Sequence, residues 1–93
     1  MPNAYVLLNT EIGAESQVLK ALKKIDGVKE VHLLWGVYDF IVSIKAETIE
    51  KLRFIITNRI EKIGKINSKL TMMLSEMPET AIQQIMLENP IFQ

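Results

Sequence analysis

The sequence predicts an α+β domain in which an antiparallel sheet carries helices on one of its faces. Three observations predict it: four short runs rich in β-branched and aromatic residues, two segments with apolar residues at helical spacing, and their order along the chain. That order is strand, helix, strand, strand, helix, strand, which is typical of a ferredoxin-like βαββαβ sandwich. A length of 93 residues predicts a single domain.

The first predicted strand and helix lie between residues 4 and 24. Residues 4–9 (AYVLLN) form a short apolar run, which predicts a buried strand. Residues 14–24 carry apolar residues three and four positions apart, and Gly27 follows as a helix stop. The predicted apolar stripe consists of Val18, Leu19, Leu22 and Ile25.

Residues 28–34 and 39–45 predict two strands joined as an antiparallel hairpin, because only residues 35–38 separate them. Alternation in the second run places Phe40, Val42 and Ile44 on one face, whereas the first run alternates imperfectly. Both faces carry apolar residues. We therefore expect helices to cover one face and the sheet of a second copy to cover the other.

The second helix is predicted to begin after Thr48, a capping residue, and to end at Gly64. Residues 65–74 alternate regularly and predict the last core strand. We assign residues 1–76 to the domain and residues 77–93 to an accessory helix or tail with an amphipathic pattern at Ile82, Ile85 and Met86. The stripe of the second helix consists of Ile49, Leu52, Ile56, Ile60 and Ile63, widened by Phe54 and Ile55.

Composition narrows the function classes. Apolar residues make up 48% of the chain, a high share for a small domain, and this predicts self-association. Eleven basic residues balance eleven acidic ones, which argues against direct binding of nucleic acid by charge. The chain has no cysteine, no basic leader and no run long enough to span a membrane, so we expect a cytoplasmic protein with no disulfide.

Catalytic chemistry has little support in the sequence. His32 is the only histidine and lies inside a predicted strand, where a core or interface role is the more common one. Ser43 and Ser68 also lie on strands without a histidine nearby in sequence. The four glycines are isolated at element ends and form no phosphate loop. We expect no catalytic residue, no metal site and no cofactor.

The hairpin end is the best candidate for a binding site. Gly36 permits an unusual backbone path, Tyr38 offers a ring and a hydroxyl, and Asp39 offers a carboxylate. An α-amino acid needs such groups, together with backbone amides, for its ammonium and carboxylate. The alternative is that Gly36 and Asp39 only shape the turn and that Trp35 belongs to the core.

The sequence resembles the effector-binding domain of the Lrp/AsnC regulators, called RAM. The resemblance covers about residues 4–75 and is most specific at Gly36-Val37-Tyr38-Asp39-Phe40. It also includes Gly27-Val28-Lys29-Glu30-Val31 before the second strand and the run from Ile63-Gly64-Lys65-Ile66 to Leu70-Thr71-Met72-Met73-Leu74. The family's usual glycine-valine pair before the last strand is Gly64-Lys65 here, and the tail after Pro78 lies outside the match.

The resemblance implies a ferredoxin-like subunit that dimerises through its sheet, the dimeric α+β barrel arrangement, with dimers assembling into octamers or decamers. It implies an effector, usually an amino acid, held between dimers. The site residues it implies are Gly36, Val37, Tyr38 and Asp39 in the hairpin loop, Thr71 and Met73 on the last strand, and His32 and Leu34 on the strand that enters the loop.

Family members also carry an N-terminal helix-turn-helix domain, for which a first strand beginning at about residue 4 leaves no room. We therefore expect a stand-alone, non-enzymatic domain that senses amino acids alone or co-assembles with full-length regulators in transcriptional or metabolic regulation. Two alternatives stay open. One is a small dimeric α+β-barrel enzyme, of the cofactor-free monooxygenase or isomerase type, in which His32, Tyr38 or Asp39 converge in a cavity. The other is a structural assembly module that binds no small molecule.

Overall fold

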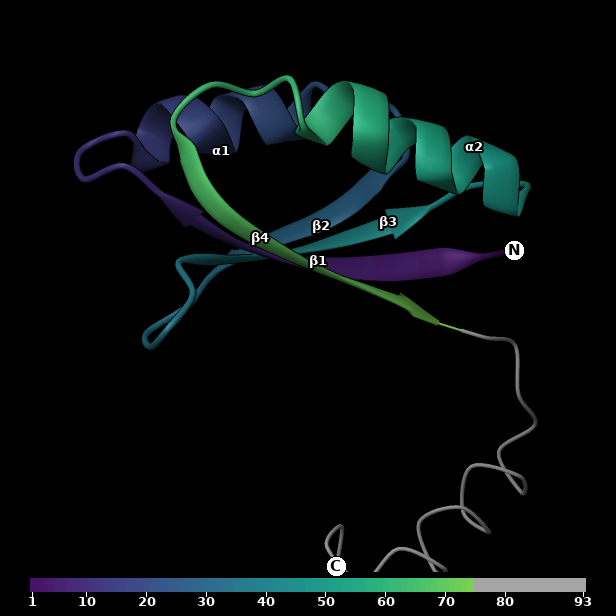
Figure 1. Cartoon of the computed structure of the whole chain (residues 1–93), viewed down its shortest axis with the longest axis horizontal. Helices are drawn as coiled ribbons and strands as arrows, with labels where there is room; N and C mark the ends of the chain where they lie inside the picture. The colour runs from purple at the N-terminus through teal and green to yellow at the C-terminus, as the bar shows by residue number, and fades with distance from the viewer. Residues whose placement is uncertain (75–93) are drawn as a thin grey trace, which may run out of the picture.

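The computed structural model describes residues 1–74, so the predicted accessory segment 77–93 lies outside the described residues. The chain folds as the sequence predicts, with two helical segments packed on one face of a four-stranded antiparallel sheet of order β2-β3-β1-β4 (Figure 1). A π-helical segment, η1, directly continues α2. The elements are β1 (Asn3–Thr10), α1 (Glu15–Lys23), β2 (Val28–Leu33), β3 (Phe40–Lys45), α2 (Ile49–Phe54), η1 (Ile55–Ile60) and β4 (Ile66–Leu74).

The core lies between the sheet and the helical layer. Alternate residues of the two central strands point toward the helices and are almost completely buried, as the period-two pattern of β3 predicts. The residues that fill this layer are Ala4, Val6 and Leu8 of β1; Phe40, Val42 and Ile44 of β3; Val18 and Leu22 of α1; and Leu52, Ile56 and Ile60 of α2 and η1.

Two register shifts explain where alternation in the sequence is imperfect. β2 pairs with β3 through Val28 and Val31, which both lie on the core side because the register shifts between Val28 and Glu30. β1 pairs with β4 with a second shift between Asn9 and Thr10. That shift turns Ile66 toward the core.

The second helix begins as predicted at Thr48, whose hydroxyl accepts a hydrogen bond from the backbone N–H of Lys51 at 3.1 Å. Successive steps of four residues in an α-helix overshoot a full turn by about 40°. The wider turn of η1 offsets this drift and keeps Leu52, Ile56 and Ile60 buried along one line. The predicted stripe is wrong at its edges, because Ile49 and Phe54 are exposed.

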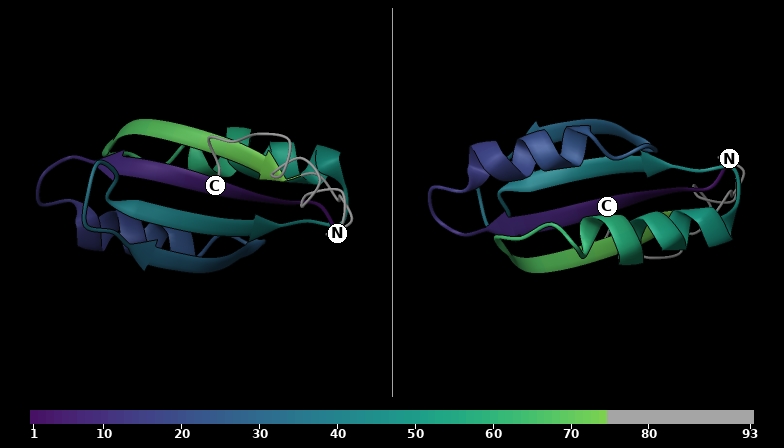
Figure 2. Two further views of the ribbon diagram at one scale, coloured as in Figure 1. Left: turned by 90° about the horizontal axis from the view of Figure 1, so that it is seen from below. Right: turned by 90° about the horizontal axis from the view of Figure 1, so that it is seen from above.

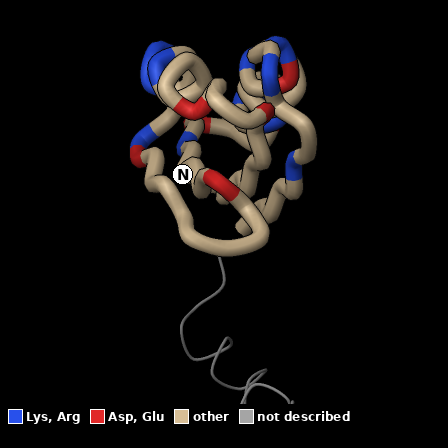
Figure 3. The backbone as a smooth tube through the Cα atoms, turned by 90° about the vertical axis from the view of Figure 1, so that its left-hand side faces the viewer, with Lys and Arg blue, Asp and Glu red and all other residues tan. Residues whose placement is uncertain are grey.

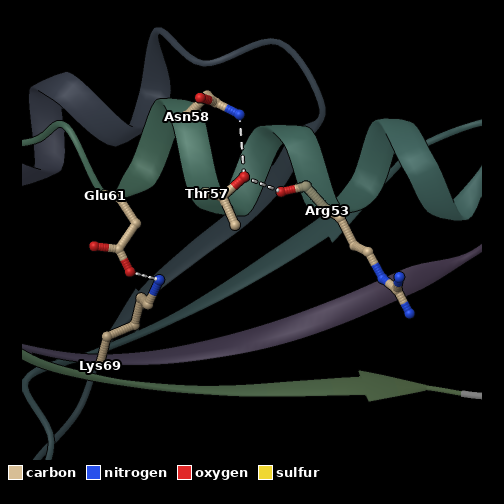
Figure 4. A network of polar contacts seen from close by, with 5 residues as sticks. All are labelled: Arg53, Thr57, Asn58, Glu61 and Lys69. Carbon is tan, nitrogen blue, oxygen red and sulfur yellow. Dashed lines mark hydrogen bonds and ion pairs between the residues drawn. The ribbon is translucent and has the colours of Figure 1, made fainter.

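Polar contacts stabilise the η1 segment and connect it to the sheet (Figure 4). The Thr57 hydroxyl donates to the carbonyl of Arg53 at 2.8 Å and accepts a hydrogen bond from the side chain of Asn58 at 3.0 Å. Glu61, at the end of η1, forms an ion pair with Lys69 of β4. The helical layer is therefore held to the edge strand by charge as well as by apolar contacts.

β4 lies at the edge of the sheet and contributes less to the subunit core than the sequence predicts. Its alternation is present, but Leu70 and Met72 point away from the helices and are exposed. Only Ile66 joins the residues packed on the core. The regular apolar pattern of this strand therefore marks the uncovered face of the sheet.

Candidate functional site

The β2–β3 loop, residues 34–39, projects from the end of the sheet where β1 ends and β4 begins (Figure 1). Gly36 has a φ of +154°, a conformation that side chains rarely adopt, and no atom lies within 4 Å of where its Cβ would be. Backbone geometry alone therefore explains the glycine. The tip of the loop makes no close packing contact at this point.

Asp39 fixes the base of the loop. Its backbone N–H donates to the carbonyl of Leu8 at 2.9 Å, and its own carbonyl accepts from the N–H of Leu34 at 2.8 Å. Its Oδ2 accepts a hydrogen bond from the backbone N–H of Thr10 at 2.9 Å, with the Thr10 hydroxyl at 3.5 Å. Asp39 is thus joined both to β1 and to Leu34, directly after the end of β2, which makes the loop base rigid.

A small polar cluster surrounds this anchor, and sequence reasoning missed it. The side chain of Asn67 donates to the carbonyl of Thr10 at 3.3 Å, and the side chain of Asn9 donates to the hydroxyl of Ser68 at 3.1 Å. Thr10 is buried at 6% exposure, although it is polar. The sequence of β1 contains a signal for this cluster, because Thr10 continues the inward positions of Ala4, Val6 and Leu8. A buried polar residue at such a position needs a hydrogen-bond partner.

The loop also carries apolar side chains in contact with water. Trp35 is fully exposed, Val37 is 83% exposed, and Leu33, the last residue of β2 before the loop, is 63% exposed. The interpretation of Trp35 as a core residue is therefore wrong for the single subunit. Tyr38 is half-buried between this apolar tip and the Asp39 anchor. Apolar groups at the tip of a hairpin with a rigid base are typical of a contact surface.

The face of the sheet that points away from the helices is the second uncovered surface (Figure 2). Its middle is apolar and its rim is polar. In the view from below in Figure 2, the strands lie in front of the helices, so that this face points toward the reader. The apolar residues at its centre are Tyr5 and Leu7 of β1, Ile41 of β3, and Leu70 and Met72 of β4.

Of the remaining predicted site residues, His32 lies beside the loop, whereas Thr71 and Met73 lie away from it in one subunit. His32 pairs with Ile41 on the uncovered face, near the rim, and its Nε2 lies 3.4 Å from the carboxylate of Glu30. Thr71 pairs with Val6 in the middle of the sheet, on the helix side. Met73 pairs with Ala4 at the end of the sheet opposite the loop.

Met73 instead lines a pocket of about 680 Å³ between the end of the sheet and α2. This pocket contains no residue of the β2–β3 loop. Within one subunit, Met73 and the loop residues therefore line different sites. The described residues that line the pocket are Met1, Pro2, Glu47, Ile49, Leu52, Arg53, Met73 and Leu74.

The enzyme alternative requires His32, Tyr38 or Asp39 to converge in a cavity, and none of these three residues lines the pocket of about 680 Å³. Among residues 1–74 no group of three or more His, Cys, Asp or Glu side chains is placed to hold a metal ion. No helix in the described part of the chain is long and apolar enough to cross a membrane. The candidate site consists of a loop with a rigid base, the ring of Tyr38, the carboxylate of Asp39 and exposed apolar side chains.

Comparison with known proteins extends these observations. Residues 3–82 match the Lrp/AsnC ligand binding domain. A curated relative, an uncharacterised helix-turn-helix-type transcriptional regulator from Pyrococcus abyssi, is 29% identical over 58 residues, which cover 62% of this chain and 39% of the relative. The chain thus corresponds to about two fifths of that longer regulator.

Solved structures show the same architecture. The chain is 33% identical to FFRP-DM1, with a TM-score of 0.76 over 81% of this chain and 100% of that one. It is 32% identical to the hypothetical protein PHS023 from Pyrococcus horikoshii, with a TM-score of 0.77 over 83% and 93% of the two chains. A transcriptional regulator from Neisseria meningitidis, solved as a complex with L-Met, shares the fold at 11% identity and a TM-score of 0.71, over 84% and 53% of the chains.

The architecture, with its exposed loop, is that of an α+β ligand-binding domain. Since the family match spans most of the chain, the protein belongs to the Lrp/AsnC ligand-binding domain family. The resemblance identified from the β2–β3 loop and the last strand is thereby confirmed.

Proposed function

We propose that this chain is the amino-acid-sensing subunit of a cytoplasmic regulatory assembly, with the effector bound at the β2–β3 loop between dimers. The observation that carries the proposal is the loop itself. Asp39 anchors its base to β1, while Trp35 and Val37 stand exposed at its tip. A rigid loop with exposed apolar groups suits a site completed by a neighbouring subunit.

The uncovered sheet face supports the first level of this assembly. Tyr5, Leu70 and Met72 are exposed there in one subunit, and a second copy of the same face would remove their apolar surface from water. Dimers formed in this way leave the loops free. Contacts of each loop with a subunit of another dimer would then join dimers into larger assemblies, as octamers or decamers.

A site shared between subunits also accounts for the separation of the predicted site residues. In one subunit Thr71 and Met73 of β4 lie away from the loop, on the helix side of the sheet. If the loop of one subunit meets the β4 region of another, both groups can contact one effector. In the loop, the Tyr38 hydroxyl and ring and the backbone amides near Gly36 are the groups proposed to bind it.

A purely structural assembly module is the second candidate, and one observation favours it. Oδ2 of Asp39 already accepts hydrogen bonds from Thr10, as expected for a residue that only shapes the turn. In that case the loop would join subunits without holding a ligand. The experiment that separates the two proposals must therefore use a residue other than Asp39.

Tyr38→Phe tests ligand binding without removing the anchor. We expect isothermal calorimetry with a panel of the standard amino acids to identify a ligand for the wild type, and Tyr38→Phe to weaken its binding about tenfold by removing one hydroxyl. Tyr5→Phe, which removes a hydroxyl from the uncovered sheet face, is the matched control and should bind as the wild type does. An intact oligomer that binds no amino acid would favour the structural module.

A further inference from the structure

The neutral charge of the whole chain conceals an uneven distribution. All eleven Lys and Arg residues lie at or before Lys69, together with eight Asp and Glu residues, so residues 1–74 carry a formal charge of +3. The three remaining acidic residues, Glu76, Glu79 and Glu88, lie in residues 75–93, which contain no basic residue. The described body is therefore basic, and the segment that follows it is acidic and rich in apolar residues.

The helical layer offers one groove that matches such a segment. It lies between α1 and the end of η1, has a volume of about 540 Å³, and is lined by Lys20, Lys24, Arg59 and Lys62. None of the described residues that line this groove is acidic. Its apolar part includes Ile25 and Ile63, which are half-buried.

Helix dipoles explain only part of this charge. Basic residues in the last turn offset the partial negative charge of a helix C-terminus, and Lys20, Lys23 and Arg59 occupy such positions. Lys62 lies beyond the end of η1, and it faces Lys20 and Lys24 across the same groove. Lys and Arg occur along both helices in Figure 3. Four cations around an apolar strip favour an occupant that is both acidic and apolar.

Chain length allows the protein's own C-terminal segment to be that occupant. β4 carries the chain about 27 Å from the groove end to Leu74, because the eight steps between its nine residues rise about 3.4 Å each. Retracing this distance requires about eight or nine extended residues. About ten of the residues between 75 and 93 then remain to fill the groove, and they include Glu88 with Ile85 and Met86.

We propose that the segment from Gln84 to Phe92 of the same chain packs in the α1–η1 groove. Glu88 lies among Lys20, Lys24 and Lys62, and the apolar side chains of the segment cover Ile25 and Ile63. The contact rests on charge complementarity, so it weakens as salt concentration rises.

Zero-length carbodiimide cross-linking of the full-length protein, read by mass spectrometry, tests this contact. The expected result is amide bonds between Glu88 and Lys20, Lys24 or Lys62. In an equal mixture of ¹⁴N- and ¹⁵N-labelled chains, these bonds should join residues of the same label. Mixed-label pairs would show that a neighbouring subunit supplies the segment. Bonds to Lys23 or Lys29 alone, or none, would likewise overturn the proposal.

Charge reversal provides an independent readout. Lys24→Glu with Lys62→Glu should increase chymotryptic cleavage after Leu87 about tenfold, and adding Glu88→Lys should restore most of the protection. Lys23→Glu, on α1 but outside the groove, is the matched control and should leave cleavage unchanged. Equal cleavage in all four proteins would contradict docking in this groove, and circular dichroism verifies that each variant is folded.

Discussion

Asp39 is hydrogen-bonded through its backbone and one carboxylate oxygen to Leu8 and Thr10 of β1 and to Leu34, directly after β2. The loop motif that carries the family resemblance therefore has a structural role within the subunit, whatever it binds in the assembly. Asp39 and Thr10 are 29 positions apart in the sequence, and no local pattern relates them. Spacing alone could place Asp39 at a hairpin, but only the fold places it against the end of β1.

Asp39→Ala should lower the free energy of unfolding by about 1 to 3 kcal/mol, because the N–H of Thr10, a buried residue, loses its acceptor. Asp39→Asn keeps an oxygen at the same position and should cost less than half as much. Urea unfolding of both variants measures the difference. Equal losses would show that the negative charge, and not the hydrogen bond to Thr10, stabilises the loop.

Lys65 is the one non-glycine residue with a positive φ in the described part of the chain, at 72°. Its carbonyl accepts a hydrogen bond from the N–H of Glu11 at 2.8 Å, which holds the turn before β4 in this conformation. The left-handed region costs a non-glycine residue about 1 to 2 kcal/mol. Lys65 stands where the family usually has valine, and its backbone is also strained.

Lys65→Gly should raise the free energy of unfolding by about 0.5 to 1 kcal/mol, since the relief of strain exceeds the greater entropy of glycine in the unfolded chain. Lys23→Gly, inside α1, should instead lower it by about 1 kcal/mol. Thermal unfolding monitored by circular dichroism compares the two. A loss of stability in Lys65→Gly would show that the turn is not strained.

Among the elements, the strands and the first helix were predicted to within one residue at each end, because β3 and α1 bury a single face and show a clear period. The second helix was predicted to end at Gly64, but it ends at Ile60. The features that the sequence did not predict have a common cause, because they depend on how one element pairs with another. The register shift in β2 depends on β3, and the outward stripe of β4 depends on what covers the far side of the sheet. For the same reason a sequence pattern could not distinguish an exposed Trp35 from a buried one.

The packing of the α1–β2 turn against η1 can be tested by substitution of a glycine. Gly27 has a φ of +101°, and a Cβ there would lie 2.7 Å from Cδ1 of Ile55 and 3.2 Å from the carbonyl oxygen of Lys45. Gly13 has a similar φ of +86° but open space around it. The two glycines therefore separate backbone strain from steric overlap.

Gly13→Ala should cost about 1 kcal/mol, from backbone strain alone, and Gly27→Ala should cost at least about 1 kcal/mol more, from overlap with η1 and β3. Chemical denaturation of both variants gives the comparison. Similar losses at the two positions would mean that the Ile55 side chain and the Lys45 carbonyl adjust freely, against the close packing described above.

For the whole molecule, the proposed dimer predicts that a charge on the uncovered sheet face prevents association. Met72→Lys would bury an ammonium group against the partner's sheet and should weaken dimerisation at least tenfold. Ile49→Lys is the matched control, because Ile49 is about as exposed as Met72, at 49% against 41%, but lies on the helical layer. Analytical ultracentrifugation measures both. Unchanged association of Met72→Lys would exclude this face from the interface.

Native mass spectrometry of the wild-type protein with an amino-acid mixture tests the central proposal most directly, because one spectrum reports subunit number and bound ligand. For an effector site between dimers, we predict dimers and larger even-numbered assemblies, with the mass of an amino acid added to the assemblies larger than dimers. Monomers in every condition, or an amino acid bound to the monomer alone, would contradict a site completed between subunits at the β2–β3 loop.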